Sequence, residues 1–152
     1  MQPKTTAELN EILKNTKPSQ VRSYLKKNRP YMADEQKAFY YYMKEVLTDK
    51  NIRLKDVYLL ANVSESYGSK ILTMEKHTTD RDLILRFCFA GHLSLPETNR
   101  ALKLYGMNEL YAKDSRDACL IVALHNRIYD MDRVDELLAE NGLKKLTAEA
   151  EK

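Results

Sequence analysis

Apolar residues recur along this chain three and four positions apart, which is the spacing of amphipathic α-helices. Strict alternation of apolar and polar residues, which indicates half-buried strands, is nearly absent. The apolar stripes predict helices around residues 9–13, 21–25, 39–47, 54–61, 67–72, 83–88, 101–105, 118–124 and 134–138. The sequence therefore predicts an all-α fold.

Polar caps and glycines predict where these helices begin and end. Two pairs, Thr5 with Glu8 and Ser94 with Glu97, have the spacing of a capping box, which satisfies free backbone N–H groups of a first turn. Further candidate N-caps are Asp34, Ser64, Asp80 and either Asp114 or Ser115. Glycines mark three expected helix ends, at Gly91, Gly106 and Gly142.

The stretch ANVSESYGSKIL, residues 61–72, predicts a tight corner followed by a helix. Asn62 tolerates the positive φ that such a corner requires, and Ser64 is the candidate cap of the helix. Gly68 lies inside that helix, where glycine costs about 1 kcal/mol relative to alanine. Either Gly68 has a packing role, or it is merely tolerated, or it kinks the helix.

Length and composition favour one helical domain with small additions. The chain has 152 residues, 43% of them hydrophobic, with four glycines and four prolines. No fixed-period repeat and no linker rich in Pro, Gly or Ser is apparent. Cys88 and Cys119 lie in apolar surroundings, which predicts buried free thiols. No apolar run approaches the ~20 residues of a membrane span, and the N-terminus lacks a signal-peptide pattern, so we expect a cytoplasmic protein without a membrane partner.

Charge is distributed unevenly along the chain. Residues 1–50 carry 10 Lys/Arg and 6 Asp/Glu, residues 51–110 carry 8 and 7, and residues 111–152 carry 7 and 9. The N-terminal third is therefore the basic part. This favours a polyanion partner only weakly, because solvated surfaces often have such a balance.

The sequence does not predict an enzyme, a cofactor site or a metal site. The three histidines are far apart, two cysteines form no zinc motif, and no glycine-rich phosphate loop is present. Carboxylate pairs such as Asp80 with Asp82 lie at predicted helix starts, where their negative charge interacts favourably with the helix dipole. The group Asp114, Arg116 and Asp117 is interpreted as a helix cap and a surface ion pair.

Residues 39–111 contain five short predicted helices, and the second and third are joined by Ala61-Asn62-Val63-Ser64. With LKDV at 54–57, Ile71 and DLIL at 82–85, this segment resembles the Cro and lambda-repressor-like (XRE) helix-turn-helix family. Asn62 stands where that family usually carries glycine. The stretches SYGSKI, DRDLIL, LSLPETNRALKLYGMNELYAKDSRDA and VDELLAENG resemble small bacterial XRE-type regulators with a helical extension.

The resemblance implies a domain organisation and a function. It predicts an N-terminal helical extension at 1–33, an XRE-like helix-turn-helix domain at 34–111, a C-terminal helical extension packed on it at 112–146, and a frayed tail at 147–152. It implies a bacterial transcriptional regulator that binds double-stranded DNA. A recognition helix at about 64–74 would enter the major groove.

The implied DNA-binding residues combine this helix with flanking cations that would hold phosphates. They are Arg53, Lys55, Ser64, Ser66, Tyr67, Ser69, Lys70, Lys76 and Arg81. Lys70 is the only cation on the recognition helix, which has no Arg, Gln or Asn for bidentate base contacts.

One alternative to DNA binding remains open at this point. It is a degenerate helix-turn-helix that serves as a protein-interaction adaptor, favoured by the tyrosine run at 40–42, because tyrosine is enriched at interfaces. The assembly is open as well: the apolar stripes at 118–124 and 134–138 would suit a homodimer, or equally a monomeric core.

The resemblance also suggests a packing role for Gly68. In the family, the second helix usually presents a small alanine to a β-branched residue of the third, and these positions correspond to Tyr58 and Gly68. Large and small residues have changed places. Because cores are close-packed, we predict that the Tyr58 ring covers Gly68.

Overall fold

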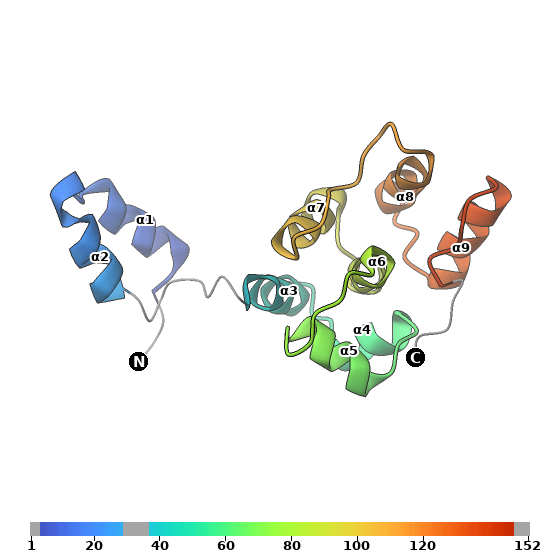
Figure 1. Ribbon diagram of the computed structural model, residues 1–152, viewed down its shortest axis with the longest axis horizontal. Coiled ribbons are helices and arrows are strands. Elements are labelled where there is room, and N and C mark those ends of the chain that lie inside the picture. Colours follow the sequence, from blue (N-terminus) through green and yellow to red (C-terminus); the bar gives the residue numbers. More distant parts are fainter. Residues whose placement is uncertain (1–3, 29–36, 148–152) are drawn as a thin grey trace. The chain divides into compact units, whose positions relative to one another are not determined.

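The computed structural model describes residues 4–28 and 37–147, and all regular structure within these ranges is helical. The chain divides into two compact units, residues 1–35 and 36–152, and each is described by itself (Figure 1). The predicted cap Asp34 lies outside the described residues.

The first unit contains α1 (Thr6–Lys14), the 3-10 helix η1 (Pro18–Gln20) and α2 (Val21–Asn28). Thr5 caps α1 as predicted, because its hydroxyl accepts the backbone N–H of Glu8. Among residues 4–28 of this unit, the buried side chains are Tyr24 and Asn28. Asn28 accepts a hydrogen bond from the Lys4 ammonium at 2.7 Å and donates one to the Tyr24 carbonyl at 3.0 Å. The large apolar side chains that remain exposed are Ile12, Leu13, Val21 and Leu25.

The second unit is built around one buried helix. Its helices are α3 (Ala38–Asp49), α4 (Leu54–Leu60), α5 (Glu65–Leu72), α6 (Arg81–Ala90), α7 (Leu95–Leu104), α8 (Ser115–His125) and α9 (Met131–Glu140). Figure 1 shows α6 among the others, and α6 packs against α4, α7 and α9. Every residue from Leu83 to Ala90 is buried. A helix that is buried all round forms the centre of a core rather than one wall of it.

The corner predicted at Asn62 is confirmed, and it is not unique in this unit. After α3, α4, α6 and α8, a residue with φ between 55° and 59° precedes an apolar residue whose N–H donates to the carbonyl five positions earlier. The left-handed residues are Asn51, Asn62, His92 and Arg127, followed by Ile52, Val63, Leu93 and Ile128. This is the Schellman arrangement, which satisfies the last free carbonyls of a helix. The corner alone therefore does not single out α4 and α5 as a DNA-binding motif.

Gly91 ends α6 as predicted, but it does not take the left-handed conformation that usually favours glycine there. Gly106 and Gly142 adopt the positive φ of a helix end, whereas Gly91 has φ −86° and His92 takes the left-handed position. A Cβ at Gly91 would lie 2.7 Å from Leu47 Cδ2 of α3. The missing side chain therefore lets α3 approach α6 closely.

The structure also reveals a weak internal repeat that the sequence analysis missed. The first turns of α6 and α8 both contain Arg-Asp, at 81–82 and at 116–117. In each pair a left-handed residue, His92 or Arg127, links the helices. The helices of each pair pack on each other, so the unit contains two similar helical hairpins.

Candidate nucleic-acid interface

The α4–α5 corner fixes the orientation of α5 through one cap and one close helix crossing. The Ser64 hydroxyl accepts the backbone N–H of Tyr67 at 3.2 Å, as an N-cap does. An ideal Cβ at Gly68 would lie 2.7 Å from Tyr58 Cδ1 and 3.1 Å from Val63 Cγ1. The predicted contact is thus confirmed: the Tyr58 ring covers Gly68.

Tyr58 is held in this position by its surroundings. Its side chain is buried, and its ring meets Phe87 of α6 edge-on with centroids 6.3 Å apart. Burial raises the pKa of Tyr58, and a hydrogen bond with the Ser69 side chain partly offsets that effect. Ser69 therefore faces the helix crossing, which leaves it poorly oriented to contact DNA.

The outer face of α5 carries Ser66 and Lys70, both exposed and four residues apart on one side of the helix. Lys55 is exposed on α4. The side chains of Ser66, Lys70 and Lys55 form no hydrogen bond or ion pair with other described residues. We call these three residues the α5 patch.

Two further residues predicted to contact phosphate, Arg53 and Lys76, interact only weakly with their neighbours. Arg53 pairs with Asp56 at 3.1 Å, and the two side chains are 77% and 41% exposed. Such an exposed pair contributes little to stability, so Arg53 can exchange Asp56 for a phosphate. The Lys76 ammonium lies 5.4 Å from the centre of the Tyr67 ring, within cation–π range. The predicted residues Arg53, Tyr67 and Lys76 therefore remain candidates for contact with DNA.

The loop after α5 is anchored to the rest of the unit. The His77 ring stacks on Tyr105 with centroids 4.9 Å apart and planes 12° apart. The Tyr105 hydroxyl accepts the backbone N–H of Thr78 at 3.0 Å. These contacts fix the backbone directly after Lys76 and so limit where its ammonium can reach.

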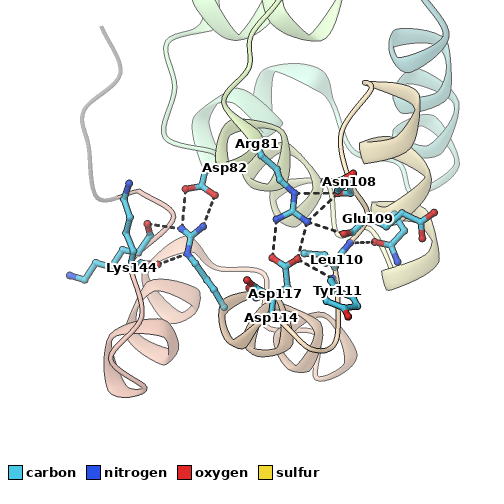
Figure 2. A network of polar contacts seen from close by, with 12 residues as sticks. Arg81, Asp82, Asn108, Glu109, Leu110, Tyr111, Asp114, Asp117 and Lys144 are labelled. Atoms are coloured by element: carbon cyan, nitrogen blue, oxygen red, sulfur yellow. Dashed lines mark hydrogen bonds and ion pairs between the residues drawn. The ribbon is translucent and has the colours of Figure 1, made fainter.

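Arg81, which was predicted to hold a phosphate, forms an ion pair within the protein instead. Its guanidinium holds Asp117 through two hydrogen bonds of 2.8 and 3.0 Å, and it also donates to the carbonyls of Asn108 and Glu109 (Figure 2). These bonds connect the start of α6 to α8 and to the loop before it. We therefore exclude Arg81 from the interface, because binding phosphate would break them.

A second arginine mirrors this arrangement. Arg116 holds Asp82 through bonds of 2.7 and 2.9 Å and donates to the carbonyls of Lys144 and Lys145. Arg81 and Arg116, at the starts of α6 and α8, thus each hold the aspartate beside the other (Figure 2). Asp114 caps α8 as predicted, but the expected surface pair is wrong, because Arg116 and Asp117 each pair with α6.

The network changes the acidity of Asp117. Burial alone would raise its pKa, but hydrogen bonds from Arg81 and from the Tyr111 N–H, with the charges of Arg81 and Arg116, outweigh burial and lower it. Sequence reasoning missed both pairs because their partners lie 36 and 34 residues apart.

The charge around the α5 patch is balanced. Residues 53–80 contain four cations and four carboxylates. The cations are Arg53, Lys55, Lys70 and Lys76, and the carboxylates are Asp56, Glu65, Glu75 and Asp80. Few phosphates can be neutralised here, so any DNA binding by this face depends on a small number of lysines.

A groove lies between α4 and α9, with a volume of about 430 Å³. Leu59 and Leu60 line it and are 76% and 52% exposed. His92 stacks on Tyr129 along it, with centroids 4.4 Å apart, and Asp130 adds negative charge. Large apolar side chains exposed together are more typical of a protein contact than of a DNA contact.

In the part of the chain that the structure describes, two kinds of feature are absent: metal-ligand groups and membrane-spanning helices. Within residues 4–28 and 37–147, no three His, Cys, Asp or Glu side chains gather as metal ligands do. No helix in these ranges has the length and apolarity needed to cross a bilayer.

Comparison of the chain with protein-family models, curated proteins and solved structures finds no match. The resemblance to XRE regulators therefore rests on the residues quoted for it.

Proposed function

We propose that this protein is a helix-turn-helix DNA-binding transcriptional regulator in which α5 enters the major groove. The observation that carries the proposal is the α5 patch: the side chains of Ser66, Lys70 and Lys55 are exposed on the two helices that the capped corner joins. The tight crossing of Tyr58 over Gly68 also holds α5 at a fixed angle to α4, so that α5 can be presented to the groove in one orientation.

The chemistry of the patch suits backbone contact with modest sequence selectivity. Lys55 and Lys70 neutralise phosphates, with Arg53 and Lys76 as flanking cations. The Ser66 hydroxyl donates to or accepts from base edges, or donates to phosphate oxygens. Glu65, exposed at the start of α5, accepts from cytosine but repels phosphate, which limits the affinity.

The salt dependence of binding tests this proposal. The full chain is titrated into a fluorescently labelled random-sequence duplex, and anisotropy is recorded over a range of salt concentrations. If Lys55 and Lys70 each neutralise one phosphate, Lys55→Gln/Lys70→Gln lowers the slope of log K against log salt by about 1.8. A matched control, Lys113→Gln/Lys145→Gln, removes two exposed lysines elsewhere and keeps the slope.

One observation favours a second candidate, a protein-interaction adaptor. Leu59 and Leu60 are exposed at the end of α4, and large apolar side chains exposed together are typical of a protein contact. The same titration separates the two functions. Salt-dependent binding that Lys55→Gln/Lys70→Gln weakens supports the regulator, and no binding to any duplex at low salt supports the adaptor.

A further inference from the structure

The groove between α4 and α9 combines apolar side chains on one side with carboxylates on the other. Leu59 and Leu60 line it from α4 and are 76% and 52% exposed. Asp130 and Asp132 line it from the start of α9, and both are exposed. We call this site the α4 groove. Its two sides call for a partner that is apolar at one end and positively charged at the other.

The negative charge of the α4 groove is not neutralised by the protein itself. Within residues 37–147, neither Asp130 nor Asp132 forms an ion pair. Among the described residues that line the groove, none is a lysine or an arginine. Arg127 and Arg133, the arginines nearest to these aspartates in the sequence, are exposed and do not line it. A cation from outside the protein therefore meets two carboxylates that no arginine or lysine already holds.

A second groove, with a volume of about 500 Å³, continues the acidic surface along α9. It shares Asp132 and Thr147 with the α4 groove and adds the exposed Glu136. Its Asp135 is already engaged, because its carboxylate accepts backbone N–H groups of the segment after α9. Lys145 is the one cation in its described lining. Carboxylates therefore outnumber cations along both grooves.

An aromatic pair in the α4 groove favours arginine as the cation. The rings of His92 and Tyr129 stack with centroids 4.4 Å apart and planes 12° apart, and both residues line the groove. Tyr129 and Asp130 are neighbours in the chain, so an aromatic ring and a carboxylate are presented together. An arginine guanidinium can stack on a ring and donate to a carboxylate at the same time, which the compact ammonium of lysine does less well.

We propose that the α4 groove binds a segment of another protein in which a large apolar side chain lies close to arginines. The apolar side chain packs on Leu59 and Leu60, and the arginines pair with Asp130 and Asp132. Lys55, one turn before Leu59 on α4, repels these arginines and so directs them towards α9.

Other occupants fit this groove less well. DNA phosphates are repelled by its carboxylates. A small polyamine leaves the two leucines uncovered. A second copy of this chain, related by a twofold axis through the groove, brings the carboxylates of both copies together. The inference names the partner chemistry for the adaptor candidate and does not rest on DNA binding by α5.

Peptide selection tests the proposal. A random peptide library displayed on phage is selected against the full chain in the absence of DNA. We expect the enriched peptides to combine a large apolar residue with arginines. One enriched peptide is then synthesised with a fluorescent label, and its dissociation constant for each variant is measured by anisotropy.

Two variants of the α4 groove should weaken binding of that peptide. Asp130→Asn/Asp132→Asn removes both carboxylates, and asparagine at 130 can still cap α9. Because exposed ion pairs are individually weak, we expect a loss of about fivefold. Leu60→Arg removes an apolar contact and adds a repelling charge, so binding should be lost.

Two matched controls should bind the peptide as the natural sequence does. Glu45→Gln/Asp49→Asn removes two exposed carboxylates of α3. Val122→Arg changes a side chain with the same 52% exposure as Leu60 in a different groove. Far-UV circular dichroism shows that each variant is folded.

Four results would overturn the proposal: no enriched peptide, enriched peptides without cations, control variants that weaken binding as much as the groove variants, or a dimer of the chain alone that Leu60→Arg dissociates in sedimentation equilibrium. In the last case a second copy occupies the groove. Because no DNA is present, these results do not depend on the outcome of the duplex titration, and the two proposals can fail separately.

Discussion

Filling the space under the Tyr58 ring tests the packing of the corner. A methyl group at residue 68 would lie 2.7 Å from Tyr58 Cδ1, whereas carbon atoms in good contact are about 3.5–4.0 Å apart. The ring cannot easily retreat, because Tyr58 is only 5% exposed and lies against Phe87. Gly68→Ala and Gly68→Val therefore force α4 and α5 apart or distort the ring.

The expected magnitude combines two opposing effects. Overpacking costs about 1–3 kcal/mol, and alanine recovers about 1 kcal/mol of helix propensity relative to glycine. Gly68→Ala should therefore lower the free energy of unfolding by roughly 0–2 kcal/mol. Gly68→Val recovers less propensity and adds two more methyl groups, so we expect a loss of about 1–3 kcal/mol.

Urea unfolding of the full chain, followed by far-UV circular dichroism, measures these values. Ser66→Val is the matched control, because it places the same side chain on the exposed face of the same helix. In a Tyr58→Ala background, Gly68→Val should cost less than it does alone, because the ring it would strike is absent. The reasoning is refuted if Gly68→Val is as stable as the natural sequence, or if the two substitutions are additive.

Three further predictions follow from the caps, the ion pairs and the thiols. Asn62→Gly should preserve stability, while Asn62→Val should cost about 1–2 kcal/mol in urea unfolding, because only the latter is strained at φ 59°; equal effects would contradict this. The folded-state pKa of Asp117 lies below its unfolded value of about 3.9, so its stabilisation is present above that pH and lost as pH falls through the folded pKa. Thermal melts should therefore show the difference between the natural sequence and Asp117→Asn shrinking on acidification, and a constant difference would refute it. Burial raises the pKa of Cys88 to about 12, whereas Cys119 is only half-buried, so a thiol reagent should label Cys119 alone until the chain is unfolded.

Features that depend on neighbours in sequence could be predicted from the sequence. The caps Ser64, Asp80 and Ser94 each accept a backbone N–H three residues ahead, and their residue types are enough to indicate this. Asn62 was predictable because few residues other than glycine tolerate its φ. The contact of Tyr58 with Gly68 spans one corner, and it required the resemblance to a family with the opposite pairing.

Features that depend on distant residues could not be predicted. In the sequence, Arg81 and Arg116 cannot be told from free surface cations. Only the fold brings Asp117 close to Arg81 and Asp82 close to Arg116. Gly91 has the sequence context of a helix end, but its role is set by Leu47 of α3, 44 residues earlier in the chain. For the same reason the sequence wrongly suggested Arg81 and Ser69 as DNA contacts, although both side chains interact within the protein. The exposure of Leu59 and Leu60 could not be predicted either.

Site-specific photo-cross-linking to DNA tests the central claim most directly. The photoreactive residue p-benzoylphenylalanine replaces Ser66 on the outer face of α5, or Lys113, an exposed residue outside the patch, and each protein is irradiated with a labelled duplex at low salt. We predict a covalent DNA adduct from position 66 and little or none from position 113. Equal adducts from both positions, or none from position 66 under conditions where the duplex is bound, would contradict the claim that α5 enters the groove.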